Sequence, residues 1–138
     1  MKTVFLVACA AKKRTAEIPA EDLYSSPLFR KSRAYVLRQL KNGDLWFILS
    51  AKHGLLEPGT VIHPYNETLN AMKKSERLEW SLKVMKALGG ILQPGNRVVF
   101  LAGLRYREFL KPKVSAVGCD TLVPMQGMRI GEQLRWLS

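Results

Sequence analysis

The sequence of 138 residues contains little cysteine and no long apolar run. Its two cysteines, Cys9 and Cys119, have no CxxC spacing and offer no disulfide framework, which suits a reducing cytoplasm. No stretch reaches the roughly 18 apolar residues that a membrane span needs. The apolar run at residues 4–11 precedes the bases at 12–14, which is the wrong charge order for a signal peptide. We therefore predict a cytoplasmic protein without a membrane segment.

Acidic residues are also scarce. The chain has 22 lysines and arginines against 11 aspartates and glutamates, which gives a formal net charge of +11. Both halves are basic, so the positive field belongs to the folded body and not to a tail. This pattern favours a polyanion, most simply double-stranded DNA, as the partner. A merely basic protein is the alternative reading.

Several motifs of known chemistry are missing. The sequence has no HExxH, no paired CxxC and no cluster of acidic residues, so we expect no metal site and no cofactor. It also lacks the phosphate-binding GxxxxGK[ST] loop, the dinucleotide-binding GxGxxG and the GxSxG of serine hydrolases. These absences argue against nucleotide triphosphatases, nicotinamide enzymes and serine hydrolases.

The apolar pattern predicts one α/β domain over residues 1–138. Continuous apolar runs typical of strands buried on both faces occur at four places. Helical patterns lie between and after these runs. We expect a three-layer α/β/α sandwich with a mostly parallel, four-stranded sheet. The four runs are residues 3–10, 45–51, 97–103 and 119–124, and the helical patterns are 20–44, 74–92, 106–112 and 127–138, with 52–72 expected as a long ordered loop.

The helical segments carry recognisable signals. Ser26 is the predicted N-cap of the first long helix, Pro27 its first turn and Gly43 its stop. Ser75 is the expected cap of the second long helix, and Pro112 the end of the short third one. In the first helix, the positions with helical spacing are Leu28, Ala34, Leu37 and Leu40. In the second helix, the stripe that we expect to be buried is Leu78, Leu82, Met85 and Leu88.

Ligands of parallel α/β sheets bind at the carboxyl ends of the strands. Four segments should meet at that edge, namely 8–14 (ACAAKKR), 50–56 (SAKHGLL), 102–108 (AGLRYRE) and 123–129 (VPMQGMR). Each combines small residues with a polar or basic one. We therefore expect the binding site at this edge.

Four residues after the second strand are the catalytic candidates. Lys52 could bind phosphate or act as an amine nucleophile, and His53 titrates near neutrality. Asn66 offers a donor and an acceptor to the edge of a base, and Glu67 is the nearest carboxylate that could act as a base. The alternatives are a solvated Lys–His pair at a strand exit and an Asx turn ahead of a short helix at residues 69–74.

Other residues at the same edge are candidates for substrate binding. Tyr24 could stack on a base, and Ser26 could hold an anion at a helix start. Alternatively, Tyr24 packs in the core, Ser26 only caps the helix, and the bases after Cys9 form an ordinary surface loop. The complete set is Cys9, Lys12, Lys13, Tyr24, Ser26, Ser50, Tyr65 and Arg105.

The segments CAAKK, AEDLYSSPLF, AYVLR, WFILSAKHGLLEP and VIHPYNETL together resemble a small bacterial and phage domain family with LYxS and SAK[YH]GLL signatures. Related segments occur in archaeosine-synthase-like proteins and, more distantly, in the uracil-DNA glycosylase-like α/β fold. The resemblance implies DNA-base chemistry, because the group includes an anti-phage glycosylase that removes glucosylated hydroxymethylcytosine. The chain departs from the pattern at Asn66, where relatives often carry Asp, and it lacks a GQDPYH-type motif.

The resemblance leads to the prediction of a DNA glycosylase that hydrolyses the N-glycosidic bond of a modified base, for example in phage DNA. Glu67, Glu57 or His53 would replace the missing Asp as the activating group. A Schiff base on Lys52 with strand cleavage ranks below simple hydrolysis. The alternatives are an N-glycosidase or phosphoribosyl-type transferase on free nucleotides, and a non-catalytic DNA-binding domain.

Overall fold

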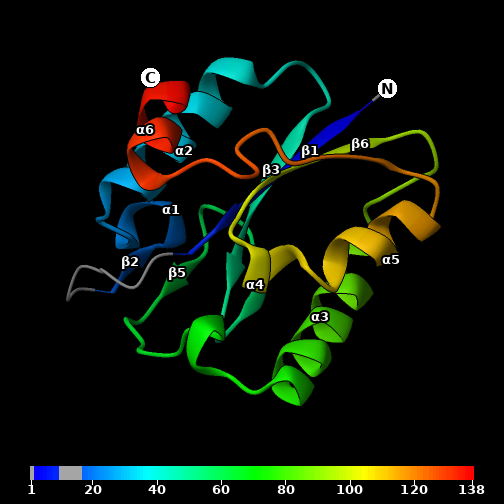
Figure 1. Cartoon of the computed structure of the whole chain (residues 1–138), viewed down its shortest axis with the longest axis horizontal. Coiled ribbons are helices and arrows are strands. Elements are labelled where there is room, and N and C mark those ends of the chain that lie inside the picture. Colours follow the sequence, from blue (N-terminus) through cyan, green and yellow to red (C-terminus); the bar gives the residue numbers. More distant parts are fainter. Residues whose placement is uncertain (1, 10–16) are drawn as a thin grey trace.

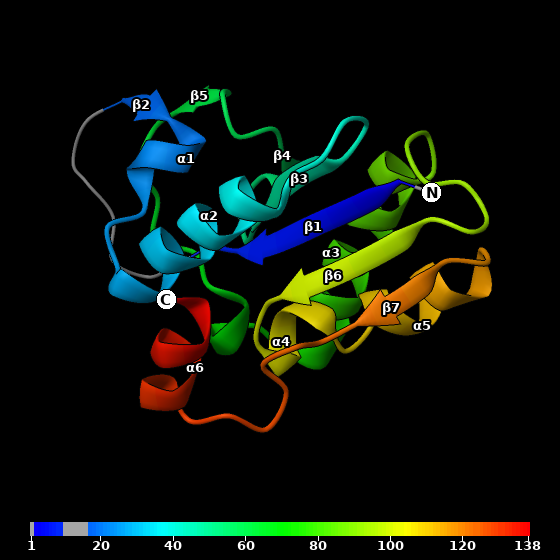
Figure 2. The same ribbon diagram turned by 90° about the horizontal axis from the view of Figure 1, so that it is seen from above.

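The fold is built on one mixed sheet. The computed structural model describes residues 2–9 and 17–138. Its five-stranded sheet has the order β4-β3-β1-β6-β7, with β1 at the centre (Figure 2). Strands β3, β1, β6 and β7 are parallel, and β4 pairs antiparallel with β3. The strands are β1 (Thr3–Ala8), β3 (Leu45–Ser50), β4 (Gly54–Leu56), β6 (Arg97–Leu101) and β7 (Asp120–Leu122).

The α/β class is confirmed, but the prediction of a mostly parallel, four-stranded sheet is wrong. The fifth strand, β4, lies in the segment expected as a loop. It forms because the chain reverses after β3 and pairs Ser50 with Gly54 and Ile48 with Leu56. Gly54 has a φ of +75°, a left-handed conformation that glycine adopts without strain. Three residues are too few to show an alternating pattern, so this strand exists only through its pairing.

Helices cover both faces of the sheet. Figure 1 shows α2 (Pro27–Gln39) and α6 (Ile130–Leu137) on one face, and α3 (Lys74–Leu88) and α5 (Leu110–Ala116) on the other. The shorter elements are α1 (Ala20–Leu23), the 3-10 helix η1 (Leu69–Ala71) and α4 (Leu104–Arg107). The short helix expected at residues 69–74 is therefore a single 3-10 turn.

The start of α2 is as predicted, but other helix boundaries are not. Ser26 caps α2 by accepting a hydrogen bond from the Phe29 amide at 3.2 Å. The helix ends at Gln39, before the turn that contains Gly43. In α3 the N-cap is Lys73 and not Ser75, because the Glu76 carboxylate accepts the Lys73 amide at 2.9 Å.

Pro112 does not end its helix. It lies within the first turn of α5, which continues to Ala116. The prediction is wrong because proline is tolerated in the first turn, where the helix needs no amide hydrogen. The expected helix at residues 106–112 is instead divided between α4 and α5.

The buried stripe of α3 agrees with the predicted one only at its C-terminal end. Leu88 is buried and Met85 half-buried as predicted, but Leu78 and Leu82 are exposed, and Trp80 and Val84 are buried in their place. The Trp80 indole donates to the Ser50 carbonyl at 2.8 Å, and Arg77 pairs with Glu108 at 2.9 Å. These two anchors set the rotation of the helix. In α2, likewise, Phe29, Ser32 and Val36 are buried, and Ala34 and Leu37 are exposed.

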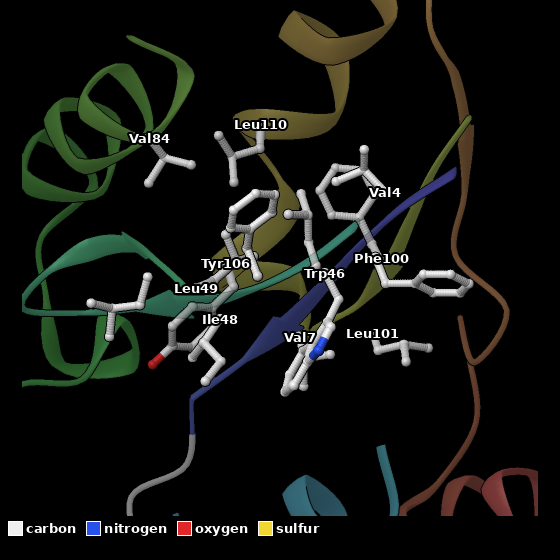
Figure 3. Packing of buried hydrophobic residues seen from close by; sticks show 14 of the residues in the cluster. Val4, Val7, Trp46, Ile48, Leu49, Val84, Phe100, Leu101, Tyr106 and Leu110 are labelled. Carbon is white, nitrogen blue, oxygen red and sulfur yellow. The ribbon is translucent and has the colours of Figure 1, made fainter. Parts of the chain in front are cut away.

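The core lies between the sheet and its helices. The strand interiors are apolar on both faces, so side chains of β1, β3 and β6 fill both layers. Figure 3 shows Val84 of α3 and Leu110 of α5 directed toward the strands, on the same side of the sheet. Such burial contributes about 1.5–3 kcal/mol for each large aliphatic or aromatic side chain.

A two-stranded antiparallel ribbon lies at one end of the sheet. Strand β2 (Ile18–Pro19) pairs with β5 (Val61–Ile62). The Ala20 amide extends the pairing by donating to the Thr60 carbonyl at 2.8 Å. This ribbon brings the segment before α1 alongside the segment before Tyr65, and so determines which side chains meet at the carboxyl edge.

Candidate functional site

Beneath the turn that follows β3 lies a buried hydroxyl cluster formed by Tyr24, Ser50 and Tyr65. The two phenol oxygens are 2.5 Å apart, and the Ser50 hydroxyl donates to Tyr65 at 2.7 Å. The Ser50 oxygen also accepts the His53 amide at 3.0 Å. The ribbon β2–β5 makes this arrangement possible, because it brings the LYSS and PYNE segments together.

Burial determines the chemistry of these hydroxyls. It raises the pKa of Tyr24 to about 12, while its hydrogen bond to Tyr65 opposes the shift and the nearby Cys9 adds to it. Burial, Cys9 and Tyr24 together raise the pKa of Tyr65 well above the ordinary value. Both phenols therefore stay protonated at neutral pH and act as hydrogen-bonding groups, not as phenolates.

The cluster does not offer a stacking surface. Tyr24 is 2% exposed, Tyr65 is 6% exposed, and Ser50 is fully buried. A base cannot reach either ring face without displacing other side chains. The alternative reading, in which Tyr24 packs in the core, is the one that its burial favours.

The turn at residues 51–53 carries the predicted Lys–His pair. Lys52 is exposed and His53 half-buried, and the His53 ring meets the Tyr65 ring edge-on at 5.5 Å. Partial burial lowers the pKa of His53, Lys52 and Lys83 lower it further, and the Glu67 carboxylate opposes them. The imidazole is therefore neutral at pH 7 and able to accept a proton.

The remaining catalytic candidates lie at the surface. Asn66 and Glu67 are both exposed, and Glu67 is close enough to His53 to affect its pKa. Lys52, His53 and Glu67 therefore form one group. Lys12 and Lys13 lie outside the residues that the structure describes.

A cavity of about 400 Å³ lies on the other side of Cys9. It is bounded by the carboxyl ends of β1 and β6, the start of α2 and the loop after β7. The volume falls in the range of about 300–1,000 Å³ typical of small-molecule sites. Parallel neighbours of β1 lie on both sides of it, so the cavity is at the topological switch point of the sheet.

Three of the four segments expected at the carboxyl edge line this cavity. They are represented by Cys9, by residues 102–104 with Tyr106 and Arg107, and by Val123 with residues 125–128. The segment SAKHGLL does not line it. The predicted convergence therefore divides into two regions, the hydroxyl cluster with its Lys–His turn and the cavity.

Cys9 and Tyr106 lie between the two regions. The Cys9 sulfur is 3.3 Å from the Tyr106 hydroxyl, which also accepts the Leu69 amide at 3.4 Å. Both residues line the cavity. Cys9 also affects the pKa of Tyr24 and of Tyr65, so it is a neighbour of the hydroxyl cluster as well.

The cavity is lined by amides and one guanidinium. Asn70, Gln126 and Gln133 reach it from η1, from the loop after β7 and from α6. Ser26, the cap of α2, lines it too. Among the residues that the structure describes, no carboxylate does. Carboxamides both donate and accept hydrogen bonds, as recognition of a base edge requires.

Of the two arginines in the segment AGLRYRE, Arg107 lines the cavity, whereas the predicted Arg105 does not. Arg105 is exposed and lies 3.8 Å from Glu108, whereas Arg107 is half-buried and lines the cavity. One Arg107 nitrogen donates to the Ala102 carbonyl at 3.3 Å. Both arginines occupy the same motif, so only the placement of α4 distinguishes them. The sequence did not indicate the carboxamides of Asn70, Gln126 and Gln133 either, because they are far apart in the chain and form no motif.

In residues 2–9 and 17–138, no three histidine, cysteine, aspartate or glutamate side chains are grouped so that they could hold a metal ion. Over the same residues, no helix combines the length and apolar character of a membrane span.

The chain is 26% identical to the uncharacterized protein YfjM of Bacillus subtilis (strain 168), over 72% of this chain and 96% of YfjM. No solved structure gives a significant match. A protein family described as a family of unknown function, DUF6884, matches residues 4–138. The chain therefore belongs to the DUF6884 family.

Proposed function

We propose that the protein is a DNA glycosylase that hydrolyses the N-glycosidic bond of a modified base and leaves an abasic site. The observation that carries the proposal is the cavity at the switch point, lined by three carboxamides and by no carboxylate of the described residues. A flipped base would enter it, and Asn70, Gln126 and Gln133 would bind the base edge. The net charge of +11 supports DNA as the partner.

The Lys–His turn would supply the proton chemistry. Hydrolysis joins a water oxygen to the sugar C1′, while the glycosidic electron pair leaves with the base nitrogen. Because the Lys–His turn does not line the cavity, the sugar C1′ would have to lie between the two regions. Neutral His53 would there accept the water proton, and the Glu67 carboxylate would stabilise the imidazolium and the positive charge on the sugar. Lys52 and Asn66, both exposed, would contact the flanking strand.

The proposal extends to the fold and to the setting. The sequence signatures LYSS and SAKHGLL support a uracil-DNA glycosylase-like fold, action on phage DNA in defence, and a cytoplasmic location. Glucosylated hydroxymethylcytosine is the first modified base to test, because the resembling group includes an enzyme that removes it.

Alkali-sensitive strand breaks test the activity. The protein is incubated with matched duplexes that carry cytosine, hydroxymethylcytosine or glucosylated hydroxymethylcytosine, and the products are heated in alkali. We expect breaks at one modified base and its release in mass spectrometry. His53→Asn should slow release at least a hundredfold, whereas Glu79→Gln, an exposed change on α3, should have no effect.

The same experiment separates the alternatives. If free nucleotides lose their base and duplexes do not, the protein is a nucleotide N-glycosidase. If DNA binds with a steep salt dependence but no base leaves any duplex, the glycosylase proposal is wrong and a binding domain remains.

A further inference from the structure

Arg107 differs from the other arginines that are at least partly buried. In the described part of the chain these are Arg33, Arg77 and Arg107. Arg33 pairs with Glu21 at 2.6 Å and Arg77 with Glu108 at 2.9 Å. Among the described residues, Arg107 has the Ala102 carbonyl as its only hydrogen-bond partner and makes no ion pair. Since burying a charge without a counter-charge is unfavourable, this position is suited to an anionic ligand.

The surroundings of Arg107 also favour an anion. The described lining of the cavity contains no acidic side chain. The N-terminus of the 13-residue helix α2 reaches the same cavity through Ser26, and its first turn has no acidic residue. The partial positive charge of a helix start adds to that of the guanidinium.

Ser32 is a second group that suggests a ligand. It lies within α2, is 2% exposed and lines the cavity. Its hydroxyl makes no hydrogen bond with a described residue, unlike Ser81, which donates to the Leu78 carbonyl at 2.6 Å. Among the described residues no fully enclosed side-chain nitrogen or oxygen lacks a partner, so the Ser32 oxygen must open onto the cavity, where a ligand atom can accept or donate its hydrogen bond.

We propose that the cavity takes a nucleoside together with its phosphate, with Arg107 binding the phosphate, the hydroxyl of Ser32 completing the ligand's hydrogen bonds, and the carboxamides binding the base. Guanidinium and phosphate match in shape and can form two parallel hydrogen bonds. The proposal rests on the proposed function for the source of this group, which would be the flipped nucleotide of DNA. The shared chemistry is that of a nucleoside monophosphate.

Binding of free ligands to the whole chain tests this assignment. Calorimetry is carried out with the four common deoxynucleoside 5′-monophosphates, the matching nucleosides and inorganic phosphate. We expect at least one monophosphate to bind at least tenfold more tightly than its nucleoside. Equal binding of the two, or no binding of any monophosphate, overturns the proposal.

Matched arginine variants locate the phosphate. Arg107→Gln should weaken monophosphate binding about tenfold to a hundredfold, the range for loss of a charge-assisted hydrogen bond, and leave nucleoside binding unchanged. Arg135→Gln removes the same charge from an exposed position of α6 outside the cavity and should change binding less than twofold. Equal effects of the two variants overturn the proposal.

Cys9 provides a readout that needs no variant. It is half-buried and lines the cavity, whereas Cys119 is 5% exposed and lies elsewhere. A bound monophosphate should slow alkylation of Cys9 by iodoacetamide and leave Cys119 unchanged. Alkylation of Cys9 that is unaffected by saturating monophosphate contradicts binding in this cavity, even if Arg107→Gln fails to fold.

The two proposals can fail separately. If monophosphates bind through Arg107 and no duplex releases a base, the ligand assignment stands and the glycosylase proposal fails. If a base is released and Arg107→Gln behaves like Arg135→Gln, the reverse holds.

Discussion

The carboxyl edge of the sheet contains two regions of opposite character. In the hydroxyl cluster, Tyr24, Ser50 and Tyr65 occupy one another's hydrogen-bonding groups and leave no room for a ligand. In the cavity, Arg107 donates to the Ala102 carbonyl but makes no ion pair with a described residue, and the Ser32 hydroxyl makes no hydrogen bond with one. About 400 Å³ is open there. Buried polar groups that are hydrogen-bonded to one another stabilise the fold, whereas polar groups that surround open space are available to bind a ligand. The difference indicates that the cluster supports the site and the cavity receives the substrate.

Filling the cavity should have the largest effect. Ala102 lines it, so Ala102→Leu would occupy space that the ligand needs. We expect base release from DNA to fall at least a hundredfold, equivalent to about 2.7 kcal/mol, with an unfolding midpoint close to that of the wild type. Gel assays of abasic sites and thermal unfolding measure the two.

The control for the cavity variant is Ala87→Leu, at an exposed position on α3. It should leave both the activity and the unfolding midpoint unchanged. If Ala102→Leu keeps full activity, the substrate does not enter the cavity and the comparison of the two regions fails.

Breaking the hydroxyl cluster should affect stability. Ser50→Ala removes the partner of the His53 amide and one partner of the Tyr65 hydroxyl. We expect a loss of about 2 kcal/mol in the free energy of unfolding, measured in urea, because buried polar groups are left without partners. Ser75→Ala, on the exposed surface of α3, should change it by less than about 0.5 kcal/mol. Equal values for both variants would mean that the cluster contributes nothing to stability.

The Lys–His turn, which belongs to the region of the hydroxyl cluster, depends on Gly54. Its φ is +75°, and an added Cβ would lie 3.4 Å from the Lys83 side chain. Gly54→Ala should destabilise the protein by about 1–2 kcal/mol in the same urea assay. Gly59 has no such φ, and nothing lies within 4 Å of an added Cβ, so Gly59→Ala should be neutral or slightly stabilising. The opposite order would contradict the strain assigned to the turn.

The smallest expected effect concerns the pH dependence of base release. The pKa of His53 lies below its usual 6.5, so the rate should fall only in acid, with a midpoint below that value, as the imidazole becomes protonated. Lys52→Ala removes one of the charges that lower this pKa, and the midpoint should move upward. Single-turnover rates measured across the acidic range test this, and a midpoint that does not respond to Lys52→Ala would separate His53 from the limiting step.

Much of the fold could be predicted from the sequence. Strand β1 and its parallel neighbours are continuous apolar runs, and Ser26–Pro27 marks the start of α2. Strand β4 could not be predicted, because three residues are too few to show the alternation of apolar and polar residues that marks a strand. The exposure of Leu78 and Leu82 was missed because the Trp80 hydrogen bond sets the rotation of α3.

The candidate site was predicted in part. The sequence indicated the carboxyl edge and the residues Lys52 and His53, but it assigned ligand contact to tyrosines that are buried in the structure. It pointed to Arg105, whereas Arg107 lines the cavity. The two arginines are two positions apart, and only the direction of α4 distinguishes them. The amides of the cavity come from distant segments, and no local pattern connects them.

By itself, the sequence determined the α/β class, the basic character of the chain and the edge at which polar residues gather. Apolar runs are local, charge is additive, and the carboxyl ends of parallel strands share one edge. Only the tertiary structure decided which of those polar residues fill one another's hydrogen bonds and which surround empty space. The ribbon β2–β5 joins Tyr24 to Tyr65, and the crossing from β3 to β6 leaves the cavity beside Cys9. Such pairings depend on packing between segments far apart in the chain, and no local sequence pattern predicts them.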